Sequence, residues 1–125
     1  MVDLNYAFCW FNILARRIFC RLFLKFMPIV YYIGTYDIDN MEEFKNYPPK
    51  VLQLLAKYGG QVLASDVEAV TLEGKARTMN AIIKFPSIEA AMGMYNDPEY
   101  QEHVRPIRLR STSNCTMVLV KEFQR

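Results

Sequence analysis

Histidine is almost absent from this sequence. His103 is the single imidazole in 125 residues, which excludes a histidine-rich metal site within one chain. Cysteine is nearly as scarce, since Cys9, Cys20 and Cys115 form an odd set without a C-x-x-C pair. Neither a disulfide framework nor a zinc site follows from this spacing. We therefore expect a reducing, cytoplasmic setting and no bound metal.

The sequence also lacks the glycine and serine motifs of common enzymes. It has five glycines, and they form neither a phosphate-binding loop nor a G-x-S-x-G nucleophile elbow. No cysteine–histidine pair with a recognisable context surrounds Cys115, which we expect to be a small core residue of a strand. These absences argue against P-loop and α/β-hydrolase chemistry, and we expect no cofactor.

Basic residues are concentrated at the start of the chain. Residues 1–26 hold four basic side chains and one acidic side chain, a net charge of +3, whereas the whole chain carries +2. Residues 27–125 therefore carry −1, with acids and bases interspersed, and they show no basic face of the kind that binds nucleic acid. The hydrophobic fraction of 52% is enough for the core of one domain and excludes a disordered chain.

The leading segment is apolar but too short to cross a membrane. Residues 4–15 are largely apolar before basic residues interrupt them, whereas a spanning helix needs about 20 apolar residues. Residues 10–26 could instead form a basic amphipathic helix on a membrane surface. We favour the alternative in which residues 1–26 are an extension outside the fold and Met27 begins a domain over 27–125. Membrane contact is then expected only if the extension is genuine.

The first pattern of the domain is a strand followed by a helix. Residues 29–37 are rich in β-branched and aromatic side chains, and their alternation places Tyr32 on one face and Tyr31 on the other. Asp39 is predicted to cap the following helix, with Glu42 completing a capping box. Two adjacent prolines within that helix predict a kink or a division into two helices, because proline lacks a backbone donor and clashes with the preceding turn.

A hairpin and a second helix follow. Residues 61–72 and 77–85 are predicted to be antiparallel strands joined by a turn at Gly74. Ser87 is predicted to cap the second helix, which further prolines interrupt. Residues 115–122 then form the last strand.

The resulting order of elements is β-α-β-β-α-β. Right-handed crossovers applied to this order predict an α+β, ferredoxin-like fold, which is a four-stranded antiparallel sheet with two kinked helices on one face. The other face would expose more apolar surface than a soluble monomer usually shows. We therefore expect a second copy of the chain to cover it in a homodimer, and the alternative is a monomer with a mixed outer face.

Four segments carry a family resemblance. They are KYGGQVL at 57–63, TLEG at 71–74, KFPSIEAAMGMY at 84–95 and DPEYQ at 97–101, followed by Arg108. As an ordered set, they resemble the uncharacterised DUF1330 family over about residues 28–123. The resemblance implies a dimeric α/β barrel, in which two ferredoxin-like protomers pair through their sheets. That superfamily includes cofactor-independent monooxygenases, haem-handling enzymes and small-molecule binders, so the fold does not choose the function. The leading segment and the adjacent Pro48 and Pro49 depart from the family's pattern.

His103 is the candidate for acid–base catalysis, because an imidazole titrates near neutral pH. Glu99 lies four residues earlier on the same predicted helix face, but the two would be an incomplete set of metal ligands. The alternative, which we favour, is a solvated histidine beside Glu102 and Arg105. A catalytic role would require the imidazole to point into a closed pocket.

Candidates for lining a small-molecule pocket between the sheet and the helices are Tyr32, Asn80, Tyr100 and Arg108. Tyrosine offers an apolar body with one hydrogen-bonding tip, and arginine can hold an anion by paired hydrogen bonds. The alternatives are ordinary packing for the tyrosines, a backbone hydrogen bond for Asn80 and a solvated helix end for Arg108.

The predicted function is therefore that of a homodimeric small-molecule-binding protein. One alternative is a cofactor-independent enzyme of monooxygenase or isomerase type that acts on a small organic substrate. Another is a structural or regulatory dimer without a ligand. A cavity of about 300 Å³ or more would favour binding.

Overall fold

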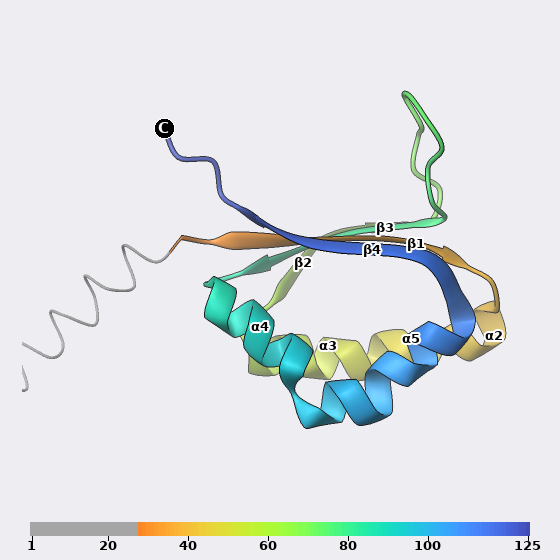
Figure 1. The fold of residues 1–125 in the computed structure, drawn as a ribbon, viewed down its shortest axis with the longest axis horizontal. Helices are drawn as coiled ribbons and strands as arrows, with labels where there is room; N and C mark the ends of the chain where they lie inside the picture. The colour runs from red at the N-terminus through yellow and green to blue at the C-terminus, as the bar shows by residue number, and fades with distance from the viewer. Residues whose placement is uncertain (1–27) are drawn as a thin grey trace, which may run out of the picture.

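The structure is a computed structural model that describes residues 28–125, so the expectations for the leading segment fall outside the described residues. In chain order the elements are β1 (Val30–Ile38), α2 (Met41–Phe44), α3 (Tyr47–Lys57), β2 (Gln61–Asp66), β3 (Met79–Phe85), α4 (Ile88–Asn96), a π-helical turn (Tyr100–Val104), α5 (Arg105–Ser111) and β4 (Thr112–Lys121). They form an antiparallel sheet of order β2-β3-β1-β4, with the helices against one face (Figure 1). The predicted ferredoxin-like fold of the protomer is confirmed.

Strand β1 lies in the middle of the sheet, between β3 and β4. Its alternation has the predicted faces, because Val30 and Tyr36 are buried under the helices while Tyr31 reaches Glu122 on the other side. The facing residue in β3, Phe85, is 1% exposed beside Val30. The core therefore lies between the sheet and the helical layer, and the opposite face of the sheet is open.

The first helix begins one residue later than predicted. The side chain of Asn40, not Asp39, caps α2 by accepting a hydrogen bond from the backbone N–H of Glu43 at 3.1 Å. The backbone N–H of Asp39 donates instead to the carbonyl of Ser111 at 2.8 Å, and its carboxylate accepts from Ser113. The predicted capping box at Asp39 is therefore wrong, because this residue ties the end of β1 to the junction of α5 and β4.

The predicted division of the first helix is confirmed. The two prolines, Pro48 and Pro49, occupy the first turn of α3, where their missing N–H groups cost no helical hydrogen bond. Helix α3 ends at Lys57, and Gly59 shortly after it has a φ of +73°, the left-handed conformation that glycine adopts without a steric penalty.

The hairpin between β2 and β3 has shorter strands and a longer connection than predicted. Strand β2 ends at Asp66, and its register shifts between Val62 and Ala64. Residues 67–78 form a long loop, here called the β2–β3 arm, which rises from the side of the sheet opposite to the helices (Figure 1). Val70 and Leu72 within the arm are 86% and 92% exposed.

The second helical region has three parts. The side chain of Ser87 caps α4, as predicted, by accepting from the N–H of Ala90 at 3.1 Å. Asp97 then accepts from the N–H of Glu99 at 2.9 Å at the start of the next helical segment. That segment opens with the π-helical turn, which ends where Pro106 cannot donate a backbone hydrogen bond.

The surroundings of Asp97 predict that the fold loses stability in acid. Hydrogen bonds from Tyr58 and Lys57 on α3 hold the pKa of its buried carboxyl at about 2, below the ordinary value of 3.8. A lowered pKa stabilises the fold fully above the unfolded value, and this contribution is lost as the pH falls from about 4 to 2. We expect Asp97→Asn to lose less stability than the wild type over this interval in urea titrations. An equally steep loss in the variant would contradict this account, and Asp66→Asn, an exposed site, serves as the control.

Candidate functional site

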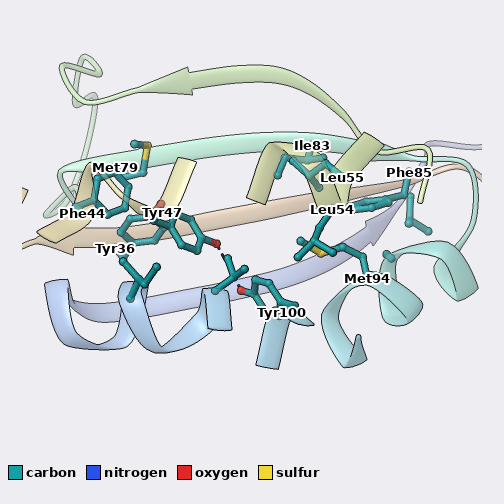
Figure 2. Packing of buried hydrophobic residues seen from close by; sticks show 14 residues of the cluster. Tyr36, Phe44, Tyr47, Leu54, Leu55, Met79, Ile83, Phe85, Met94 and Tyr100 are labelled. Atoms are coloured by element: carbon teal, nitrogen blue, oxygen red, sulfur yellow. Dashed lines mark hydrogen bonds between the residues drawn. The ribbon is translucent and has the colours of Figure 1, made fainter. Parts of the chain in front are cut away.

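A cavity of about 280 Å³ lies between the sheet and helix α3. Its walls are almost entirely apolar and aromatic side chains from both layers. They are Tyr32, Tyr36, Phe44, Tyr47, Pro48, Val51, Leu52, Leu55, Val62, Ser65, Met79, Ala81, Ile83, Phe85, Met94 and Tyr100. Figure 2 shows its two ends, with Tyr36, Tyr47 and Tyr100 gathered at one and Leu55, Phe85 and Met94 at the other.

The first of these ends, here called the tyrosine end, carries phenolic hydroxyls in an apolar setting. The hydroxyls of Tyr47 and Tyr100 point toward each other at 3.5 Å (Figure 2). Burial raises the pKa of Tyr36 to about 12, and it also raises the pKa values of Tyr32 and Tyr47. These three hydroxyls are therefore protonated at neutral pH, so they can donate hydrogen bonds to a ligand but are poor general bases.

The position of Tyr32 depends on a glycine two residues further along β1. A Cβ atom on Gly34 would lie 2.9 Å from Cε1 of Tyr32 and 3.1 Å from its hydroxyl oxygen, closer than side chains tolerate. The ring of Tyr32 thus lies across the strand at Gly34. The absence of a side chain there sets the shape of the cavity wall.

Arg108 on α5 is 3% exposed and does not line the cavity, but it is near enough to Tyr100 and Tyr47 at the tyrosine end for its charge to act on them. Its Nη1 donates to the sulfur of Cys115 on β4 at 3.1 Å, and its buried Nε has no hydrogen-bond partner. Within residues 28–125, no carboxylate lies within 4.0 Å of this guanidinium. A buried cation without a counter-ion is costly, so its position requires an explanation.

The guanidinium of Arg108 remains charged despite this burial. Burial lowers the pKa of Arg108, but the pKa still lies above the ordinary value for arginine and therefore far above neutral pH. In turn, the charge of Arg108 opposes the rise in the pKa values of Tyr32 and Tyr36. The four tyrosines and Arg108 therefore form one electrostatically connected cluster.

A second cavity, of about 200 Å³, lies beside the first against α4 and β4. Tyr32 and Phe85 line both cavities and so form the wall between them. The second cavity is otherwise lined by apolar and aromatic residues, namely Ala91, Met92, Tyr95, Met117, Val118 and Leu119.

Comparison with known proteins places the chain in a family. Residues 29–123 match the family described as "Domain of unknown function (DUF1330)". The chain belongs to this family. No curated protein matches the DUF1330 chain.

Solved structures share the fold of this DUF1330 chain. A protein of unknown function from Rhodopseudomonas palustris is 16% identical, with a TM-score of 0.68 over 78% of this chain and 85% of its own. Its methylated form gives 16% identity and a TM-score of 0.69 over 78% and 83%. A protein from Bacteroides fragilis, described as dimeric, of unknown function and of ferredoxin-like fold, is 12% identical, with a TM-score of 0.55 over 75% and 96%. At these identities the likeness concerns the fold alone.

The structure brings three of the five predicted site residues of the DUF1330 chain together. Tyr32 and Tyr100 line the cavity, and Arg108 is near enough for its charge to act on both. Asn80 lies in the register of Thr35, on the open face of the sheet, and its amide donates to the carbonyl of Arg77 at 3.1 Å.

His103 lies outside the cavity. Its side chain is 61% exposed within the π-helical turn, and its Nε2 is 4.0 Å from the carboxylate of Glu102. It contributes nothing to the cavity wall.

Sequence reasoning missed two members of the cluster, Tyr36 and Tyr47. Tyr36 shares a strand face with Tyr32, so alternation was a sufficient signal for it, whereas Tyr47 looked like an ordinary member of a helical stripe. The prediction that Cys115 is a core residue is wrong, because it is exposed on β4 at the edge of the sheet.

In residues 28–125, no group of three or more histidine, cysteine, aspartate or glutamate side chains is placed to hold a metal ion. No helix in the same range has the length and apolar character needed to span a membrane.

Proposed function

We propose that this DUF1330 chain is a homodimeric small-molecule-binding protein whose ligand occupies the cavity between the sheet and α3. The main observation that supports this proposal is the cavity. Its volume of about 280 Å³ is close to the lower limit of about 300 Å³ for ligand pockets, and a cavity of about 150 Å³ already holds benzene. Its apolar walls with a few polar groups at one end resemble those of ligand sites generally.

The ligand would enter between α3 and the edge strand β2. Leu52 on α3 and Val62 on β2 both line the cavity, and they are 52% and 40% exposed. The cavity is therefore open to solvent along this rim and closed toward the tyrosine end.

Filling the cavity should abolish binding. Ala81 lies on the cavity wall in β3, and Ala81→Leu would place three further carbon atoms inside it. We expect compounds that raise the melting temperature of the wild type to lose this effect in the variant. Thermal shift with a panel of single-ring and short-chain acids, amides and alcohols would measure it.

Ala56→Leu on the exposed side of α3 is the matched control, and it should retain every shift. Shifts that persist in a folded Ala81→Leu protein would place the ligand elsewhere and overturn the proposal for this cavity.

The open face of the sheet supports the homodimer. An apolar row crosses all four strands, through Ala64, Ile82, Ile33 and Val118, which lie side by side in the strand register. The β2–β3 arm rises from this same side of the sheet and carries exposed Val70 and Leu72 (Figure 1). A second copy would cover both features, and the Bacteroides fragilis protein of similar fold is described as dimeric.

A charge on the arm should weaken the dimer without affecting the fold. Leu72 is 92% exposed and therefore contributes little packing within the protomer. We expect Leu72→Asp to shift the protein from dimer toward monomer in sedimentation equilibrium, with a weakening of at least about tenfold, because a desolvated charge is costly. Leu109→Asp on α5, a half-exposed leucine of the helical layer, should leave the mass unchanged. A wild-type protein that is monomeric at all concentrations would overturn the dimer.

A further inference from the structure

The unpaired charge of Arg108 restricts the chemistry of the ligand. This side chain is 97% removed from solvent, its Nε has no partner, and the sulfur of Cys115 accepts the hydrogen bond of its Nη1. The exposed Arg110 on the same helix differs in this respect, because it forms an ion pair with Glu43 at 2.7 Å. A guanidinium buried without a carboxylate is compensated when an anion binds nearby.

The groups around Arg108 favour an anion that accepts hydrogen bonds. Four phenolic hydroxyls lie at the tyrosine end, those of Tyr32, Tyr36, Tyr47 and Tyr100, and the last two are 3.5 Å apart. Arg108 is near enough for its charge to act on these side chains. Phenolic O–H and guanidinium N–H groups are donors, and a carboxylate is an acceptor with two oxygens.

The walls beyond the tyrosine end determine which chemical groups the rest of the ligand can carry. Beyond the tyrosine end the walls are apolar, with Leu55, Ile83, Phe85 and Met94 facing the space (Figure 2). A second charge there would lose its hydration without compensation, which disfavours dicarboxylates and phosphate esters. A ring or short chain would instead bury apolar surface.

We propose that the ligand is a small monocarboxylate with an apolar ring or chain, whose carboxylate lies at the tyrosine end and balances the charge of Arg108. The inference rests on the proposed binding function and narrows it to one substrate class. The volume of about 280 Å³ fits a single ring carrying a carboxylate, since about 150 Å³ accommodates benzene.

The test compares acids with amides of the same shape. Benzoate with benzamide, and hexanoate with hexanamide, are titrated into the full chain by isothermal calorimetry, with thermal shift as the second readout. We expect each acid to bind at least about tenfold more tightly than its amide, as a charge-assisted hydrogen bond requires. Arg108→Gln should remove this preference, Arg108→Lys should keep part of it, and Arg110→Gln should keep all of it.

The outcomes separate this inference from the proposed function. Amides that bind as tightly as acids would overturn the carboxylate and leave the binding cavity intact. Acetate or inorganic phosphate binding as tightly as benzoate would overturn the apolar part of the ligand. A folded Arg108→Gln protein, judged by circular dichroism, that keeps the acid preference would overturn the role of Arg108. If no acid or amide of either series binds, the proposal of a monocarboxylate ligand is overturned, and the proposed binding function loses its support.

Discussion

Replacement of Arg108 by methionine is expected to leave the free energy of unfolding unchanged or to raise it by about 1–4 kcal/mol. Methionine has a similar length, fills irregular space and removes a charge that is buried without a carboxylate partner in residues 28–125. The protein would become more stable while losing its preference for acids, as is common where a functional group is held in an unfavourable environment. Urea unfolding of the ligand-free protein, with the slope of the transition compared between variants, measures the effect.

Arg110→Met is the control for this prediction. Arg110 is on the same helix, but its side chain is 61% exposed and paired with Glu43, and exposed ion pairs contribute about 0–1 kcal/mol. It should therefore change stability little and slightly downward. A loss of more than about 2 kcal/mol in Arg108→Met would show that the guanidinium holds the fold together, and Arg108 would then be a structural residue.

Phe85→Ala is expected to lower the free energy of unfolding by about 3–5 kcal/mol. The ring of Phe85 is 1% exposed in the core and forms, with Tyr32, the wall between the two cavities. Its removal would therefore join the two cavities. The loss of stability should be near the upper end of this range, because the rigid strands limit how far the surrounding side chains can move in to fill the space. The same variant should accept acids with longer or branched bodies that the wild type excludes.

Phe123→Ala provides the matched control, because Phe123 is 84% exposed near the end of the chain. It should change stability by no more than about 0.5 kcal/mol. A comparable loss in both variants, or a loss below about 1 kcal/mol in Phe85→Ala, would contradict the assignment of Phe85 as the wall.

The fold was predictable because its signals are local. Alternation within β1 and β3 identifies which residues share a face, and Ser87 and the two adjacent prolines mark where helices begin. The cap at Asn40 was missed because Asp39 is equally suited by type. The choice between them depends on a contact with Ser111, 72 residues further along, that no local pattern contains.

The candidate site was predictable in part, for a related reason. Alternation shows which residues of one strand share a face, but it does not show how two strands align. Asn80 was therefore grouped with Tyr32, although its register partner is Thr35, which faces the open side of the sheet. The helical period does continue beyond Tyr100, because Val104, Ile107 and Arg108 are buried four, seven and eight residues further along. The burial of Arg108 could therefore have been predicted from helical spacing, whereas its lack of a carboxylate partner depends on contacts between elements distant in the sequence.

The π-helical turn has a consequence for the evolution of the family. A π-helical turn closes its hydrogen bonds over five residues instead of four, so it accommodates one residue more than an α-helical turn. A relative with one residue fewer in Tyr100–Val104 could form an α-helical turn there and keep the direction of the side chains that follow. A residue lost outside this turn, between Val104 and Arg108, would instead rotate the position of Arg108 by about 100° and point it away from the tyrosines, even if an arginine were still encoded there. Conservation of arginine at this position would therefore be an insufficient guide to ligand class among relatives. The place at which a relative gains or loses a residue between the positions of Tyr100 and Arg108 would separate relatives that can bind an acid in this way from those that cannot.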